Sequence, residues 1–285
     1  MTDRSAPPAR RRPNPLAVDV LRTQRISATM IRIVFGGAEL ERFNGSPFTD
    51  SYVKLMFPRA GVRYPSPLDM ERVRAEVPTA DWPVVRTYTV RAWNPETREL
   101  TIEFVVHGGA GVAGPWAAAA KPGDRIFLQG PGGAYSPDPA ADWHLLAGDE
   151  SALPAISAAV ESLPAHAVGR VLIEVHGPES EVELQVPAGV TLTWVHSGKT
   201  KIGRSLVDAV AAIDLPTGDV QVFVHGEAGF VADLRRLLRV ERGLPRDRLS
   251  ISGYWRIGAD EEGWRAAKAA WNAAAEELEQ RAGAA

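Results

Sequence analysis

Apolar and polar residues alternate along most of the first half of the chain. Short runs rich in Val, Ile, Phe and Tyr, separated by turn-forming residues, occupy 16–26, 29–37, 51–58, 84–94, 99–107 and 124–130. Alternation with a period of two is typical of strands that bury one face. Six such strands predict a closed antiparallel barrel. A long exposed loop over 59–81 and a short helix within 115–124 are expected between them.

The pattern changes near residue 142. Apolar strand-like runs follow at 143–148, 168–177, 190–198 and 219–228. Helical periodicity marks 149–163, where Asp149 or Ser151 can serve as N-cap, and 226–243. We expect helices after the first strand run and after those at 168–177 and 219–228. Strands alternating with helices imply a parallel sheet with crossover helices.

The last segment, 260–281, predicts one more amphipathic helix. Its apolar residues recur at helical spacing, namely Trp264, Ala267, Trp271, Ala274 and Leu278. This face can pack on its own domain or on a second copy, so a monomer and a homodimer both remain open.

Length and composition narrow the class of protein. At roughly 100–200 residues per domain, 285 residues indicate two domains. We expect a disordered tail over 1–15, followed by a barrel domain over 16–138 and an α/β domain over 139–285. The net charge of −3 argues against nucleic acid as a partner. No cysteine is present, which excludes disulfides, thiolate nucleophiles and cysteine-ligated metals.

Targeting and metal signals are weak. No apolar stretch approaches the roughly 20 residues of a membrane-spanning helix, and the basic, proline-rich N-terminus is not followed by the apolar region of a secretory signal. We therefore expect a cytoplasmic protein without a membrane span. The histidines show no HxH or HExxH spacing, so no protein-bound metal is expected.

The strand 86–91, with the sequence RTYTVR, combines an aromatic ring with hydroxyl and guanidinium groups. Side chains alternate along a strand, so Arg86 and Tyr88 face one way while Thr89 and Arg91 face the other. A flavin needs a surface for its flat ring and cations for its diphosphate. Spacing alone supports equally well a barrel strand with surface arginines.

RTYTVR resembles the R-x-Y-T/S-x-R flavin motif of siderophore-interacting proteins, which are ferric-siderophore reductases of the ferredoxin–NADP reductase superfamily. SYVKLMFP (51–58), LLAGDESALPAI (145–156) and HGEAG…GYWRIGADEEGW (225–264) are similar to the same family. The resemblance implies a six-stranded FAD-binding barrel followed by a parallel α/β domain that binds NADH or NADPH. It assigns the isoalloxazine to Arg86, Tyr88 and Thr89, and the diphosphate to Arg91.

The glycine-rich turn 107–117 contains a GxGxxG pattern, but Lys121 to Asp124 end any helix too early for a Rossmann dinucleotide fingerprint. A turn followed by a helix N-terminus, able to bind phosphate, fits better. The resemblance places the FAD diphosphate here, with the candidate contacts His107, Gly108, Gly114, Trp116 and Ala117. His107 can equally be an ordinary histidine at a strand end.

Two segments are candidates for the nicotinamide nucleotide. Asp149 and Ser151 can hydrogen-bond flavin or nicotinamide edges or simply cap a helix. The resemblance assigns the segment with His225, Gly226 and Glu227 to NADH or NADPH. The choice of donor stays open because a 2′-phosphate prefers cations and a free ribose an acid. Both occur in neighbouring loops, as Glu179, Glu181 and Glu183 and as Lys199, Lys201 and Arg204.

The substrate implied by the resemblance is a ferric siderophore. Lys54 and Arg256 match basic positions of the family's substrate pocket, whereas a third basic position is occupied by Gly132. We therefore expect a flavoprotein that passes electrons from NADH or NADPH through FAD to the iron, with no side chain acting as acid, base or nucleophile. A flavin-dependent reductase with another acceptor and a non-catalytic siderophore carrier are the alternatives.

Overall fold

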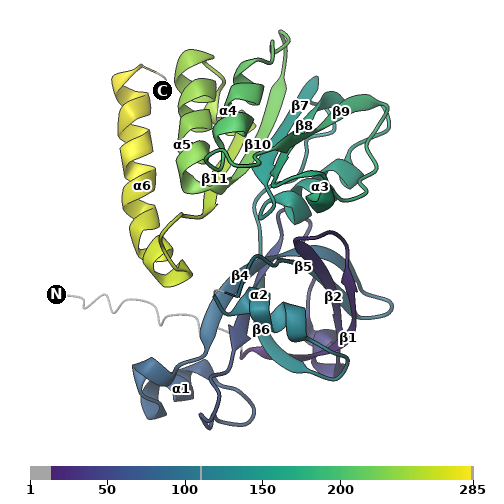
Figure 1. The fold of residues 1–285 in the computed structure, drawn as a ribbon, viewed down its shortest axis with the longest axis vertical. Coiled ribbons are helices and arrows are strands. Elements are labelled where there is room, and N and C mark those ends of the chain that lie inside the picture. Colours follow the sequence, from purple (N-terminus) through teal and green to yellow (C-terminus); the bar gives the residue numbers. More distant parts are fainter. Residues whose placement is uncertain (1–13, 110, 284–285) are drawn as a thin grey trace, which may run out of the picture.

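The computed structural model describes residues 14–109 and 111–283, so the predicted tail lies, except for Asn14 and Pro15, outside the described residues. Six antiparallel strands form a closed barrel in the order β1-β2-β5-β4-β3-β6 (Figure 1). Their bounds are β1 (Leu16–Arg25), β2 (Met30–Gly36), β3 (Tyr52–Phe57), β4 (Val84–Asn94), β5 (Glu99–Val105) and β6 (Arg125–Gly132). The six predicted strands and the barrel are confirmed.

The barrel core is filled by alternate side chains of every strand, among them Ile33, Leu55, Leu100 and Ile102, which are fully buried. Helix α2 (Ala113–Ala119) packs against the barrel core, and it overlaps the short helix that was predicted within 115–124. Its Trp116 ring lies 5.6 Å from Phe57 and 6.0 Å from Phe104, measured between ring centroids.

The segment predicted as an exposed loop over 59–81 contains helix α1 (Met70–Glu76) and the 3₁₀ turn η2 (Thr79–Asp81). Asp69 caps α1 by accepting hydrogen bonds from the N–H groups of Glu71 and Arg72. Met70 and Val73 are buried against Met56 of β3. The loop prediction is therefore wrong here, because these few apolar residues build a small core of their own outside the barrel. Another 3₁₀ turn, η1 (Ala38–Arg42), follows β2.

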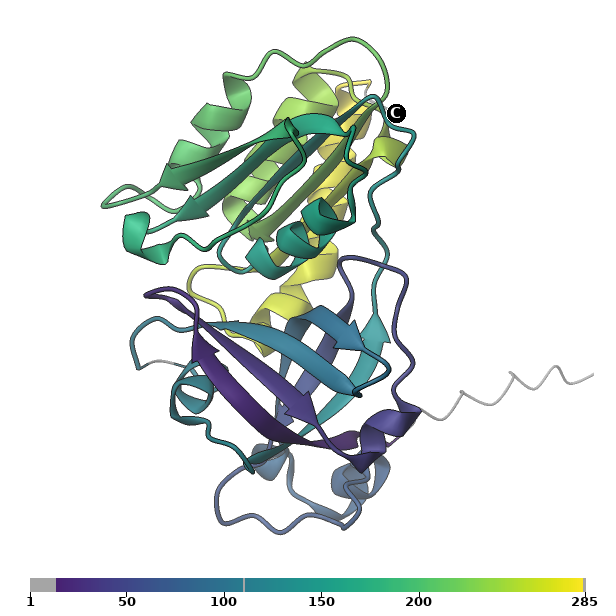
Figure 2. The same ribbon diagram turned by 90° about the vertical axis from the view of Figure 1, so that its right-hand side faces the viewer.

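The second half of the chain forms a parallel five-stranded sheet in the order β11-β10-β7-β8-β9. Its strands are β7 (Trp143–Asp149), β8 (Val168–Val175), β9 (Gly189–His196), β10 (Val220–Glu227) and β11 (Leu249–Trp255). The helices are α3 (Leu153–Ser162), α4 (Arg204–Ala211), α5 (Ala228–Arg236) and α6 (Glu261–Arg281), with short turns η3 (Pro178–Ser180), η4 (Leu237–Glu241, π-helical) and η5 (Arg246–Arg248). Helix α3 covers one face, and α4 and α5 cover the other (Figure 2). The predicted fold class is thus confirmed.

Three local predictions fail in this layer. Within the described residues, β8 is followed by the short turn η3 and no α-helix; residues 181–187 have no regular secondary structure, and Val182, Leu184 and Val186 pack on the core beside α3. Helix α4, on the opposite face of the sheet, follows β9, where no helix was predicted. Strand β11 was not predicted, because its serines and half-buried positions give no apolar run.

Helix ends and faces also differ in detail. The N-cap of α3 is Ala152, which makes no side-chain cap hydrogen bond, in place of Asp149 or Ser151. On α6, Trp264 is buried as expected, but Leu278 is 43% exposed and the adjacent Glu279 is buried. The buried face is rotated because Glu279 forms an ion pair with Arg235 of α5.

The carboxyl ends of the parallel strands point toward the barrel. Thr29, between β1 and β2, donates a hydrogen bond to Glu150, just after β7. The start of α6 reaches β4 of the barrel (Figure 1). The layers therefore meet at the edge where α/β proteins bind ligands. In 14–109 and 111–283, no helix is long and apolar enough to span a membrane.

Candidate functional site

Strand β4 carries an open edge at the junction of the two layers. It pairs with β3 from Val84 to Thr89, whereas its pairing with β5 begins only at Val90. The N–H of Val90 donates to the carbonyl oxygen of Ser51, the residue before β3, and successive N–H groups of a strand alternate in direction. Within the described chain, the N–H groups of Thr87 and Thr89 therefore face an edge with no neighbouring strand.

The predicted flavin residues surround this edge. The Tyr88 ring lies 4.4 Å from the Phe104 ring, centroid to centroid, and burial raises the pKa of its phenol. Arg86 donates to Val85 O (2.7 Å) and to Glu262 of α6 (3.0 Å). Thr89 is 8% exposed. Backbone donors, a hydroxyl and a ring are thus gathered where a flat heteroaromatic ligand would find an edge to bind.

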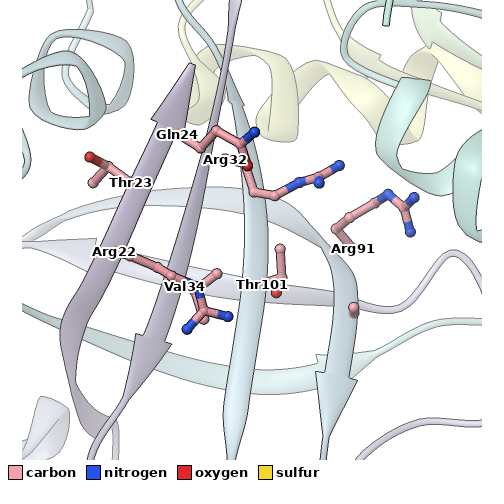
Figure 3. A pocket seen from close by; sticks show the side chains of 8 residues that line it. Arg22, Thr23, Gln24, Arg32, Val34, Arg91 and Thr101 are labelled. Atoms are coloured by element: carbon pink, nitrogen blue, oxygen red, sulfur yellow. The ribbon is translucent and has the colours of Figure 1, made fainter. Parts of the chain in front are cut away.

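Arg91 lies on the outer face of the barrel, where the pairing of β4 with β5 shifts register. It borders a hollow of about 320 Å³ lined by Arg22, Thr23, Gln24, Arg32, Val34, Arg91, Ala92 and Thr101. Figure 3 shows the guanidinium groups of Arg32 and Arg91 near one end of this hollow and that of Arg22 further along the barrel surface.

The arginines of the hollow are balanced by carboxylates. Glu103, 4% exposed, accepts from Arg32 Nε at 2.8 Å, and Arg91 donates to Glu161 of α3 at 2.8 Å. The buried Nε of Arg91 forms an ion pair with Glu103 Oε1 at 3.6 Å and has no hydrogen-bond partner among the described residues. The guanidinium of Arg91 lies beside that of Arg32 at this hollow, and two neighbouring guanidinium groups suit phosphate oxygens, so the residues present fit the diphosphate of a flavin nucleotide.

Arg32 and Arg22 did not emerge from the sequence. No local motif connects either of them with Arg91. The pairing of Arg32 with Glu103 across β2 and β5 brings it to the same face. Only the strand order reveals these neighbours.

The turn 107–117 separates into two parts. His107 and Gly108 are exposed, and Gly108 has a positive φ of 57°. Trp116 and Ala117 instead pack in the barrel core. Gly114 lies against the backbone, because a Cβ there would come within 3.3 Å of the Val105 carbonyl.

Asp149 and Glu227 hold the strand ends of the parallel sheet together. Asp149 Oδ1 accepts from the N–H and Oγ–H of Ser151, and its Oδ2 accepts from Glu227 N–H and Trp255 Nε1–H, both at 2.8 Å. Burial raises the pKa of Asp149 despite these donors. Glu227 accepts from the N–H groups of Gly229 and Phe230 at the start of α5. The carboxylate oxygens therefore already have protein donors.

His225 and Gly226 lie between these acids. The His225 ring is buried and stacked on Phe223 at 4.0 Å, and burial lowers its pKa to about 3. Gly226 has a φ of 140° and leaves no room for a Cβ, which would lie 2.5 Å from the Phe230 ring. A nucleotide at this edge would therefore contact mainly backbone atoms. The predicted polar side chains would act indirectly, by holding that backbone in place.

The two predicted substrate residues are unpaired cations. Lys54 lies on β3 directly opposite Thr87 of β4, and Thr87 is hydrogen-bonded to Glu261 at the start of α6. Arg256 precedes that helix by a short exposed turn. Across the described residues, neither the Lys54 amine nor the Arg256 guanidinium forms an ion pair. Both are therefore available to an anion at the junction of the layers.

Comparison with known families matches both halves of the chain. Residues 19–135 match the siderophore-interacting FAD-binding domain, and residues 141–258 match the siderophore-interacting protein family. The chain belongs to the siderophore-interacting protein family.

Relatives with this family's fold cover nearly the whole chain. An uncharacterized protein of Mycobacterium tuberculosis is 48% identical over 87% of this chain and 93% of its own length. The ferric vibriobactin reductase of Vibrio cholerae is 34% identical (88% and 92%), and the NADPH-dependent ferric-chelate reductase of Escherichia coli is 31% identical (83% and 91%). The crystal structure of the siderophore-interacting protein SipS from Aeromonas hydrophila superposes with a TM-score of 0.76 at 32% identity, covering 90% of this chain and 97% of that one.

Proposed function

We propose that this siderophore-interacting protein is an FAD-dependent reductase that passes electrons from NADH or NADPH to the iron of a ferric siderophore. The observation that carries the proposal is the open edge of β4, which brings Tyr88 and Thr89 to the junction of the layers, with Arg91 following on the same strand beside Arg32. The named activities of the V. cholerae and E. coli relatives support the same reaction.

The FAD residues divide by chemistry. The open N–H of Thr89 and the Tyr88 ring would hold the isoalloxazine, with Arg86 beside them. Arg91 would bind the diphosphate, joined by Arg32 and by the exposed part of the turn 107–117. Glu161 is 44% exposed and can swing away, so Arg91 can exchange a carboxylate for a phosphate without moving its backbone. Bound FAD supplies the link between a two-electron donor and an acceptor that takes one electron.

NADH or NADPH would bind along the carboxyl ends of β7 and β10, which lie next to each other in the sheet. The strand order changes direction there, which opens the crevice that nucleotides use. Asp149 would act by fixing the backbone N–H groups of Ser151 and Glu227, and Glu227 by fixing those at the start of α5. No side chain here is required as an acid or a base.

Lys54 and Arg256 would attract the ferric chelate. Unpaired cations at a junction between layers raise the encounter rate of an anionic substrate and orient it. The iron is a substrate in this proposal and needs no ligands from the protein.

The test begins with the visible spectrum of the purified protein reconstituted with FAD. We expect flavin absorption bands that bleach under anaerobic conditions with NADH or NADPH, and bands that return when ferric tris(2,3-dihydroxybenzoate) is added while an Fe(II) indicator develops colour. Flavin that is bleached but reoxidised only by quinones or electron-transfer proteins would indicate a different acceptor. A colourless protein that binds the chelate without oxidising NAD(P)H would establish a carrier instead.

A further inference from the structure

Tyr52 covers the place where a side chain at position 132 would project. The two residues lie opposite each other in the β3–β6 pair. A Cβ added to Gly132 would lie 2.5 Å from Tyr52 Cζ and 2.6 Å from its hydroxyl oxygen. The Tyr52 ring therefore lies across β6, directly over Gly132.

The backbone does not require glycine at this position. Gly130, two residues earlier, has a φ of 141°, whereas Gly132 is not among the glycines with positive φ. Space for the ring is thus the physical reason for Gly132. A larger residue there and the observed ring position exclude each other.

The ring is accessible and close to the candidate site. Tyr52 is 38% exposed, and its hydroxyl has no hydrogen-bond partner in the described part of the chain. In the β3–β4 pair, Tyr52 lies opposite Thr89 of the open edge. Lys54 follows two residues later and so faces the same way. An exposed aromatic ring, a cation and the open edge thus share one face of the barrel.

We propose that Tyr52 is a specificity-determining residue that contacts aromatic iron-binding arms, so that the preferred substrates are aryl chelates of the catecholate or hydroxyphenyl class. The inference rests on the proposed function, because it assumes that a ferric chelate approaches this face. A flat aryl arm can stack on the Tyr52 ring while Lys54 faces the charge of the chelate. Aliphatic hydroxamate and carboxylate chelates have no ring to stack.

The test uses gallium(III) chelates, which bind as ferric chelates do but are not reduced. Dissociation constants are measured on the flavin-loaded protein for gallium tris(2,3-dihydroxybenzoate) and for gallium citrate, which is anionic but not aromatic. The variants are Tyr52→Ala, Tyr52→Leu and Tyr52→Phe. Tyr52→Phe keeps the ring and is the matched control for folding and shape.

We expect Tyr52→Ala to weaken binding of the aryl chelate about two- to tenfold, the range of an aromatic pair. Tyr52→Leu should show an intermediate loss and Tyr52→Phe none, while gallium citrate binds all variants equally. Gly132→Val, which displaces the ring without adding a charge, should reproduce the loss for the aryl chelate. An equal change for both chelates, or no change in Tyr52→Ala, would overturn the inference.

Failure of this inference and failure of the proposed function can be told apart. Gallium binding requires no electron transfer, whereas flavin content and bleaching by NAD(P)H require no siderophore. Tyr52→Ala with unaltered flavin bands, normal bleaching and unaltered gallium binding would reject the role of Tyr52 alone. Loss of flavin from Tyr52→Ala would also reject it, by assigning the ring to the cofactor.

Discussion

Thr87 and Glu261 are joined by two hydrogen bonds across the junction of the layers. The Thr87 N–H donates to Glu261 Oε2 at 3.0 Å, and the Thr87 hydroxyl donates to Glu261 Oε1 at 2.7 Å. The neighbouring Glu262 pairs with Arg86. The first turn of the C-terminal helix is thereby attached to the open edge of β4, so the end of the chain helps to hold the barrel against the parallel sheet.

Removal of this attachment should loosen the edge. In Glu261→Ala the Thr87 N–H loses its acceptor, and we expect hydrogen exchange in the peptide 84–91 of the flavin-free protein to become about tenfold faster, as for a lost hydrogen bond of roughly 1.5 kcal/mol to a charged group. Mass-spectrometric hydrogen exchange measures this. The control is Glu276→Ala, which removes an exposed carboxylate of the same helix that pairs with Arg246. It should leave the exchange rate of the peptide 84–91 unchanged. Equal rates in both variants would show that Glu261 does not protect the edge.

Arg91 should be needed for flavin retention. We expect Arg91→Ala to be purified with little flavin and to bind FAD at least tenfold more weakly, because it loses a charge-assisted contact to the diphosphate. Absorbance ratios and FAD titration measure this. Glu161→Gln removes the ion pair between the layers but leaves the arginine, and it should keep the flavin. Full occupancy in Arg91→Ala, or equal flavin loss in both variants, would contradict this assignment.

Lys54 and Arg256 should affect the substrate and not the cofactor. Alanine at either position should raise the KM for an anionic ferric chelate about two- to fivefold, as expected for solvent-exposed charge contacts, with flavin content unchanged. The difference from the wild type should shrink at high salt. Lys121→Ala, which removes an exposed cation beside Asp124, is the control. A change in flavin content without a change in KM would show that the two cations serve the cofactor.

His225 should make the protein less stable in acid. Its imidazole takes up a proton near pH 6.5 in the unfolded chain but only at about pH 3 in the folded protein, because burial lowers the pKa. Its contribution to the free energy of unfolding therefore falls as the pH drops from 6.5 toward 3, by up to about 1.4 kcal/mol per unit. Denaturant unfolding at several pH values should give a shallower decline for His225→Gln. The exposed His166→Gln should decline as the wild type does; indistinguishable slopes for all three proteins would disprove the prediction.

Local patterns in the sequence determined the fold class. Period-two alternation identified all six barrel strands, because a strand with one buried face shows its burial in its own residues. The pattern failed where burial is arranged differently. Strand β11 is only half-buried, and α6 places the charged Glu279 inward, since Arg235 of another helix neutralises it. Nothing in the sequence of the α6 segment indicates that Arg235 is its partner.

The motif RTYTVR pointed to the candidate site, and its residues stay a prediction. Only the tertiary structure joined Arg32 to Arg91, laid Tyr52 over Gly132 and brought Glu261 to Thr87. These contacts link residues far apart in the chain through strand order and the docking of two layers. A short motif reflects the neighbours that a residue has along its own strand, whereas contacts across strands and between layers depend on how the whole chain closes.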